Sequence, residues 1–526
     1  MNANQRARTA ALLLVLTVTF GLAGRLPAQS RPSAPPEYKE MVAASQIADP
    51  ALRLKEFERL KAAYPNSTYR EAMDASIQDA KVALATTLED VISLQKDFLA
   101  SGQGPVRLQK PVAMAVQLLN HPRLETFDHT RVLDLVLAYR AQALKAAADP
   151  ASFEGIPAEQ RDYFKSSIVN GFEMLTARAY LNAGDTDKAM YALESYKKSG
   201  GATGGNYYYV LAGILENTGK MTQAADAYMA AAVENYMDAA VKARALYAQI
   251  HGSADGFQAA FEAKQKALPF QPEPFQPPSV WRGKAVLAEL FTGSECPPCV
   301  GADIAFDALL QTIPSKYLAV LVYHLPIPRP DPMMNPATGS RAVAYEISST
   351  PTAVIDGTNR SVGGGGRGAA EAKFVQYRGL IEPLLAAVPA VSLKAQAKLE
   401  GDTVKIAYDL DKVIDGVEYI LVLVQGEQEH RGSNGVAVHR MVVRDLQVID
   451  PAAAKTAAFD LAASEKTTDA YLSEFERTHT RIPNFKWAVR RHTIPRQGLR
   501  VVLFAQERAS GKVLNAVVAE VKQAPR

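Results

Sequence analysis

The sequence predicts a multidomain protein with an α-helical N-terminal domain, an α/β central domain and a β-sandwich-like C-terminal domain. Three observations support this fold class. Residues 40–265 place apolar side chains at spacings of three and four, which is typical of helices. Residues 282–389 alternate strand-like and helix-like stretches, and residues 390–526 hold short β-rich runs separated by turn residues. The 526 residues suffice for several domains of about 150 residues each.

The composition is that of an ordinary globular protein, with 48% hydrophobic and 21% charged residues. The 58 basic and 55 acidic residues give a formal net charge of +3. This balance provides no electrostatic reason to expect a nucleic acid or an anionic membrane as a partner. After the N-terminal apolar run, no stretch approaches the roughly 20 apolar residues of a membrane span, so we expect no transmembrane segment after signal cleavage.

Residues 1–28 have the order of a secretory signal peptide. Arg6 and Arg8 precede an apolar run at 10–24, and small and polar residues follow up to Ala28. The run is short for a bilayer span, although an uncleaved anchor is the alternative. We therefore expect an exported protein.

Two segments of the helical domain repeat each other. Gly184 with Ala189 and Gly219 with Ala224 recur 35 residues apart, close to the tetratricopeptide period of about 34. The glycine suits the end of one helix, and the small alanine lets the next helix pack closely. These segments resemble tetratricopeptide hairpins, which implies a repeat-like domain over 40–265. Such a domain either binds a protein partner or serves as a helical scaffold.

A proline-rich segment, residues 266–281, follows the helical domain. Five prolines within ten residues cannot continue a helix and favour an extended spacer. We expect a domain boundary here. A strand, helix, strand, short helix, strand and helix are then expected at 284–291, 300–311, 318–324, 338–347, 352–357 and 369–387. The β-rich runs that follow are 391–399, 403–410, 419–425, 436–443, 499–506 and 513–521.

Cys296-Pro297-Pro298-Cys299 contains the only two cysteines of the chain. A strand before the pair and a helix after it are the context of a redox dithiol. A disulfide across so short a loop restrains the unfolded chain little, so chemistry explains the pair better than stability does. Cys296 would meet unpaired N–H groups and the positive dipole end of the helix, which favour a thiolate. We expect Cys296 to be the nucleophile and Cys299, one turn on, to resolve the mixed disulfide.

The segment Phe291-Thr292-Gly293-Ser294-Glu295-Cys296-Pro297-Pro298-Cys299 resembles the active-site segment of the thioredoxin superfamily. It is most similar to secreted bacterial members with Phe-Thr-Gly before the motif, which implies a location in the periplasm or cell envelope of a bacterium. Thr350-Pro351-Thr352 matches the family's second hallmark, a cis-proline that faces the dithiol and helps to bind substrate backbone. The resemblance covers about a fifth of the chain. It implies a thioredoxin-like domain over 282–389, with Thr350 and Pro351 as substrate-binding residues.

The sequence departs from the thioredoxin pattern at two positions. Glu295 stands where thioredoxins usually have tryptophan, and its charge would oppose a thiolate if it pointed at the sulfur. Leu290 occupies the place of a buried aspartate that accepts the resolver's proton in many members. Glu289 is adjacent, but strand alternation sends it to the opposite face.

The predicted function is an exported thiol–disulfide oxidoreductase that acts on protein dithiols and disulfides with an unknown redox partner. The alternative is a non-catalytic cell-envelope scaffold or interaction protein that uses its helical repeats. We expect no cofactor. We also expect no metal, because only His324 lies near the cysteines and no second ligand pair has zinc spacing.

Several other motifs are expected to have structural roles. The glycine run at 363–366 lacks the pattern of a phosphate-binding loop, so it predicts a flexible turn. His430 and His439 are expected to be structural or surface residues. Asp331 and Asp356 are expected in turns or on the surface.

Overall fold

The computed structural model describes residues 35–99, 104–480, 482 and 485–523. The chain divides into two compact units, Met1–Phe261 and Glu262–Arg526. The expected signal peptide, residues 1–28, lies outside the described residues. Within the described residues, every helix is too short or too polar to cross a membrane.

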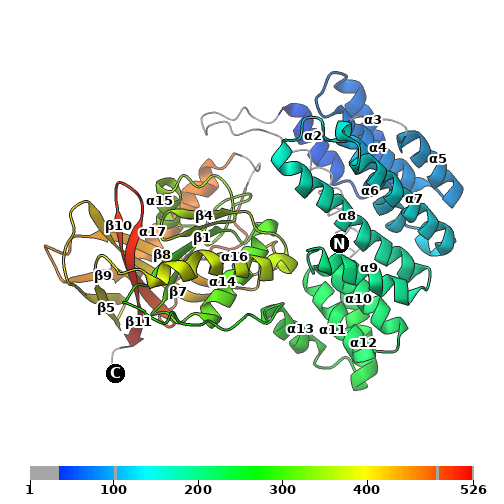
Figure 1. Cartoon of the computed structure of the whole chain (residues 1–526). Coiled ribbons are helices and arrows are strands. Elements are labelled where there is room, and N and C mark those ends of the chain that lie inside the picture. Colours follow the sequence, from blue (N-terminus) through cyan, green and yellow to red (C-terminus); the bar gives the residue numbers. More distant parts are fainter. Residues whose placement is uncertain (1–34, 100–103, 481, 483–484, 524–526) are drawn as a thin grey trace. The chain divides into compact units, whose positions relative to one another are not determined.

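The first unit is helical where it is described, as the sequence predicts. Sequence neighbours such as α3 and α4, α6 and α7, and α10 and α11 pack together in pairs (Figure 1). Aspartate side chains accept backbone N–H groups at the starts of several helices, which satisfies donors that lack helical partners. The helices are α2 (Pro36–Ser45), α3 (Pro50–Ala63), α4 (Arg70–Leu84), α5 (Leu88–Leu99), α6 (Val106–Leu119), α7 (His129–Ala147), α8 (Ala158–Asn182), α9 (Thr186–Lys198), α10 (Gly205–Asn217), α11 (Met221–Val233), α12 (Ala239–His251) and α13 (Phe257–Lys266), which runs into the second unit.

The two similar segments form helical hairpins, α8–α9 and α10–α11. Gly184 and Gly219 follow α8 and α10 with φ of 83° and 75°, a left-handed conformation that favours glycine. Ala189 and Ala224 are fully buried in the next helix. The predicted helix ends and close packing are therefore confirmed at both places.

The second unit is built on one eleven-stranded sheet with the order β4-β3-β1-β2-β8-β7-β10-β11-β5-β6-β9. Its strands are β1 (Val286–Thr292), β2 (Leu318–His324), β3 (Thr352–Ile355), β4 (Asn359–Val362), β5 (Leu393–Glu400), β6 (Thr403–Leu410), β7 (Val417–Glu429), β8 (Val438–Ile449), β9 (Thr456–Asp460), β10 (Leu499–Glu507) and β11 (Val513–Gln523). Its helices are α14 (Val300–Thr312), α15 (Pro336–Ala344), α16 (Ala370–Ile381) and α17 (Leu461–Thr478).

The first part of this sheet follows the order β1-α14-β2-α15-β3-β4-α16. β1 pairs with β2 in parallel and with β3 antiparallel, and β4 continues antiparallel beside β3. Helices α14 and α16 pack against each other, and α14 also packs on β1. The central strand β1 is buried along its whole length. The predicted alternation of strands and helices in 282–389 is therefore confirmed.

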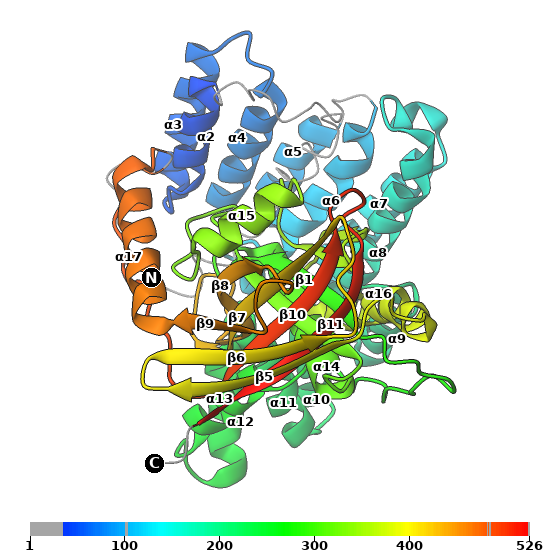
Figure 2. The same cartoon turned by 90° about the vertical axis from the view of Figure 1, so that its left-hand side faces the viewer.

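Residues 390–526 do not form the separate sandwich that the sequence predicts. Strand β8 pairs in parallel with β2 at Val322 and Val442, so the expected boundary at 389/390 lies inside one sheet. Strand β7 serves two hydrophobic cores, because alternate side chains such as Val422 and Leu421 enter different ones. The second core lies among β5, β6, β7, β9, β10 and β11, where β5 and β6 cross in front of the long strands (Figure 2).

The proline-rich segment is packed against the second unit instead of forming a free spacer. The ring centroid of Phe270, in this segment, lies 5.5 Å from that of Phe374. Phe275 and Trp281 lie 5.1 Å and 4.9 Å from the ring of Tyr317. The prolines prevent regular structure as predicted, whereas the interleaved aromatic residues anchor the segment.

Candidate functional site

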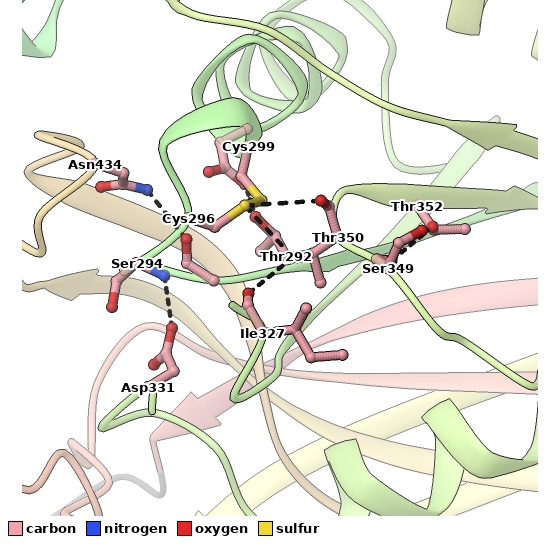
Figure 3. Close-up of a disulfide and its surroundings, with 12 residues drawn as sticks. Thr292, Ser294, Cys296, Cys299, Ile327, Asp331, Ser349, Thr350, Thr352 and Asn434 are labelled. Carbon is pink, nitrogen blue, oxygen red and sulfur yellow. Dashed lines mark hydrogen bonds between the residues drawn. A yellow bond between two sulfur atoms is a disulfide. The ribbon is translucent and has the colours of Figure 1, made fainter. Parts of the chain in front are cut away.

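The two cysteines lie at the end of β1 and the start of α14, where they form a disulfide (Figure 3). Cys296 has an extended backbone and precedes a single 3₁₀ turn, Pro297–Cys299. The Cys299 N–H donates to the Cys296 carbonyl at 3.0 Å, and the two Cα atoms are 5.3 Å apart. Both cysteines are fully buried, whereas the two prolines are exposed. The turn thus holds both sulfurs at the positive end of α14.

Thr350 lies beside the Cys296 sulfur. Its Oγ1 is 3.4 Å and its carbonyl oxygen 3.8 Å from Cys296 Sγ. The same hydroxyl donates to the Ile327 carbonyl at 2.8 Å. Because a hydroxyl carries one proton, a Cys296 thiolate would compete with Ile327 for it. The Thr350–Pro351 peptide is cis, so the structure brings the predicted dithiol and the predicted cis-proline segment together.

The glycine run at 363–366, predicted to be a flexible turn, is a loop packed against the dithiol turn. The Gly365 N–H donates to the Pro298 carbonyl at 2.7 Å, and the Gly301 N–H donates to the Gly365 carbonyl at 2.8 Å. A Cβ on Gly364 would lie 2.2 Å from the Pro298 carbonyl oxygen and 2.6 Å from Pro351 Cγ. Only glycine permits this approach, which ties the dithiol turn to the cis-proline segment.

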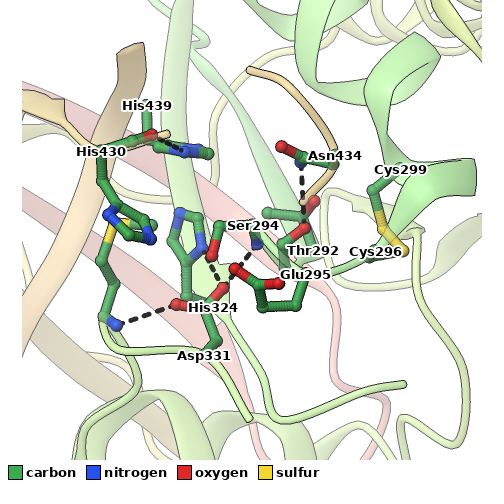
Figure 4. Close-up of polar contacts among 12 residues, drawn as sticks. Thr292, Ser294, Glu295, Cys296, Cys299, His324, Asp331, His430, Asn434 and His439 are labelled. Carbon is green, nitrogen blue, oxygen red and sulfur yellow. Dashed lines mark hydrogen bonds and ion pairs between the residues drawn. A yellow bond between two sulfur atoms is a disulfide. The ribbon is translucent and has the colours of Figure 1, made fainter. Parts of the chain in front are cut away.

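The loop between β7 and β8 supports the other side of the dithiol turn (Figure 4). Asn434 donates from its backbone N–H to the Ser294 carbonyl at 3.0 Å and from its side chain to the Gly293 carbonyl at 3.2 Å. The Ser433 N–H lies 3.3 Å from both carboxylate oxygens of Glu295. The Glu295 charge is therefore engaged by this loop.

Asp331 and His324 form a buried pair behind the dithiol turn (Figure 4). Asp331 Oδ2 lies 2.9 Å from His324 Nδ1 and accepts the Ser294 N–H at 2.6 Å, while Oδ1 accepts the Met333 N–H at 2.8 Å. Burial alone would raise the pKa of Asp331, but the charge of His324 and these hydrogen bonds outweigh burial and lower it. Asp331 thus fixes the backbone two residues before Cys296.

His439 and His430 extend this polar cluster. The rings of His324 and His439 meet edge to face with centroids 4.9 Å apart, and His439 Nε2 lies 3.0 Å from the His430 carbonyl. Burial, together with the charge of His324, lowers the pKa of His439 to about 3. His439 is therefore a neutral structural residue, in agreement with the prediction.

Asp356 lies in a turn, as predicted, and Asp331 directly precedes one, but both aspartates are buried and neither lies on the surface. Asp331 is fully buried, and Asp356 is 3% exposed. Asp356 pairs with Lys284 at 2.7 Å and accepts the Leu287 N–H at 2.9 Å. Asp356 thus binds the backbone at the start of β1, and Asp331 binds the backbone just after its end.

Glu289 points away from Leu290, as strand alternation predicts, and enters a buried network. Its carboxylate accepts from Arg341 at 2.7 and 3.0 Å, from Tyr323 at 2.9 Å and from Tyr345 at 2.6 Å. Every carboxylate oxygen is thus satisfied, which suits a structural role.

Sequence reasoning missed two acidic residues on α14. Asp303 Oδ1 accepts the Thr292 hydroxyl at 2.7 Å, while its buried Oδ2 has no hydrogen-bond partner in the structure. Asp307 pairs with Arg440, and burial raises its pKa to about 7. Both line a small pocket with Leu290. The available signal was their spacing of four and eight residues from Cys299 in a helix that is otherwise mostly apolar.

No protein-family model, curated protein or solved structure matches this chain. Among the described residues, no group of three or more His, Cys, Asp or Glu side chains is arranged to hold a metal ion. Function is therefore inferred from the residues around the disulfide.

Proposed function

We propose that this chain is an exported thiol–disulfide oxidoreductase of the bacterial periplasm or cell envelope, acting on protein dithiols and disulfides. The observation that carries the proposal is the Cys296–Cys299 disulfide at the start of α14, with Thr350 3.4 Å from Cys296 Sγ. The strand order β4-β3-β1-β2 around a parallel β1–β2 pair is that expected of a thioredoxin-like domain and supports the proposal.

In the proposed reaction, reduced Cys296 attacks a substrate disulfide and forms a mixed disulfide. Cys299 then attacks Cys296 Sγ and releases the substrate as a thiol. The helix end and the Thr350 hydroxyl stabilise the Cys296 thiolate. Thr350 and the cis-proline at 351 would align substrate backbone beside the sulfur. An unknown redox partner restores the starting state.

The full chain tests this function with a protein disulfide substrate such as insulin. We expect wild-type protein to reduce insulin in the presence of a chemical reductant, and Cys296→Ser to lose this activity. Cys299→Ser should accumulate a mixed disulfide that non-reducing electrophoresis detects. Full insulin reduction by Cys296→Ser would refute the proposed function.

A non-catalytic scaffold is the second candidate, and the complete burial of both cysteines favours it. The helical hairpins of the first unit would then bind a protein partner, and the dithiol domain would be a structural support. Partners captured equally by wild type and by a Cys296→Ser, Cys299→Ser variant would favour the scaffold. Partners trapped only by Cys299→Ser, and released by reductant, would favour the enzyme.

A further inference from the structure

Cys299, Asp303 and Asp307 occur at every fourth position of one helical segment, so they lie along one stripe of α14. Two acidic side chains inside a protein are costly unless cations or hydrogen bonds compensate them. Asp307 meets this requirement through Arg440. Asp303, one turn from Cys299, meets it only in part.

The carboxyl of Asp303 is only half satisfied. Thr292 donates to Oδ1, but the buried Oδ2 has no partner, and within the described residues no basic side chain pairs with Asp303. Burial raises the pKa of this carboxyl well above its usual value, and the charges of Asp307 and Asp331 add to the effect. The raised pKa and the unpartnered Oδ2 make Asp303 a candidate proton acceptor one turn from Cys299.

The other groups that face Asp303 would not take over this role. Tyr377 on α16 has a buried hydroxyl without a partner, and its pKa is raised by burial and by Asp303. His439 and Arg440 on β8 line the same small pocket, but His439 bonds to the His430 carbonyl and Arg440 to Asp307. Asp331 is held by its own hydrogen bonds.

We propose that Asp303 accepts the proton of Cys299 when Cys299 resolves the mixed disulfide. This inference rests on the proposed function. The Asp303 carboxyl belongs to α14, four residues after Cys299. Strand β1 contributes the apolar Leu290 to the same pocket.

The Cys299 thiol gives its proton to the Asp303 carboxylate. The resulting thiolate attacks Cys296 Sγ, and the Cys296–Cys299 bond forms. The bond between Cys296 and the substrate sulfur breaks, and its electron pair leaves on that sulfur, which then takes a proton from water. The protein dithiol is oxidised, and the substrate disulfide is reduced.

The test uses the reduced full chain and the aromatic disulfide 5,5′-dithiobis(2-nitrobenzoate), which releases one coloured thiolate when Cys296 attacks and a second when Cys299 resolves. We expect Asp303→Asn to leave the first release within about twofold of wild type and to slow the second by about 100-fold near pH 7. Asp303→Glu should restore part of the second rate. Asp307→Asn is the matched control, with the second rate nearly unchanged.

The outcomes separate the two proposals. Two rapid releases from Asp303→Asn would overturn the role of Asp303 and leave the proposed function intact. No release from reduced wild type would refute the proposed function itself. If Asp303→Asn does not fold, Asp303→Glu decides. A shift in the pH midpoint of its second release relative to wild type supports Asp303, and an identical midpoint excludes it, because the helix end acts on Cys299 equally in both proteins.

Discussion

Gly432 approaches Ser294 so closely that a Cβ on Gly432 would lie 2.2 Å from the Ser294 carbonyl oxygen. The contact joins the β7–β8 loop to the backbone that leads into Cys296. Asn434, two residues further along the loop, donates to the same carbonyl at 3.0 Å. The geometry of the dithiol turn therefore depends on a glycine far away in the sequence.

Gly432→Ala should destabilise the second unit by about 1–3 kcal/mol, because the added methyl group must displace either the loop or the dithiol turn. Urea unfolding of the oxidised full chain measures the change. Gly379→Ala is the control, since a Cβ there meets no atom within 4 Å in α16. It should be neutral or stabilising by up to about 1 kcal/mol. Equal stabilities of the two variants would contradict the close contact.

Thr350→Val should raise the pKa of the reduced Cys296 thiol by about one unit, because a hydrogen bond to a charged group contributes roughly 1.5–3 kcal/mol. The pH dependence of iodoacetamide alkylation in a Cys299→Ser background gives this pKa. Thr312→Val serves as a control, since the Thr312 hydroxyl donates to the Ala308 carbonyl at 2.8 Å at the far end of α14. An unchanged pKa in Thr350→Val would mean that the Thr350 hydroxyl stays with Ile327.

Arg341→Met should lower the free energy of unfolding by about 3–5 kcal/mol, because it leaves the Glu289 carboxylate buried without a cation. Adding Glu289→Gln to this variant should recover part of the loss in urea unfolding. Arg477→Ala breaks an exposed pair with Glu474 and should change stability by less than about 1 kcal/mol. A mild effect of Arg341→Met would show that the two tyrosines suffice to hold Glu289.

His439→Gln should make the second unit more resistant to acid. The folded pKa of His439 is about 3, below the ordinary histidine value of 6.5, so the unfolded chain binds more protons between these values. The contribution of neutral His439 to the free energy of unfolding is therefore fully present above about pH 6.5 and is lost as the pH falls toward 3. Glutamine keeps a donor for the His430 carbonyl and does not titrate.

Urea unfolding at pH 7.5 and pH 4 compares wild type with His439→Gln. The variant should lose less stability between the two pH values, by roughly 3 kcal/mol for the single group. His324, His430 and Asp331 face His439 and are present in both proteins, so any contribution they make appears in both curves. The same loss in wild type and variant would contradict the burial of a neutral His439.

The sequence predicted the residues at the centre of the candidate site because their types are rare and their local settings are distinctive. Cys296 and Thr350 lie 54 residues apart and meet in the structure. The order of strands and helices between them limits where each can lie, so a local pattern was enough. Glu289 was likewise assigned to the correct face by strand alternation alone.

The joining of the sheet could not be predicted in this way. Strand β7 is apolar at successive positions because both of its faces are covered, and such a run looks the same in a sandwich and in a mixed sheet. Strand β7 is joined to β1 and β2 through its neighbour β8. That connection depends on one parallel pairing between β2 and β8, Val322 with Val442, which no local pattern encodes. The contact of the β7–β8 loop at Gly432 with Ser294 could not be predicted for the same reason.

The acids of α14 were missed for another reason. An acidic residue in a helix usually marks the face exposed to solvent, so the sequence predicted no role in the site for Asp303 and Asp307. Their burial follows from the packing of α14 against α16 and β1, which is a property of the tertiary structure. Their positions, four and eight residues after Cys299, place both on the same side of the helix as Cys299.

The support from Gly432 also has a consequence for biosynthesis. The ribosome delivers Cys296 and Cys299 well over a hundred residues before the β7–β8 loop. The nascent chain therefore carries two thiols whose final surroundings have not yet been made, and β2 lacks its partner β8 during the same interval. We expect chains truncated at residue 389 to aggregate or to form disulfides between molecules, whereas the completed chain closes the pair within itself.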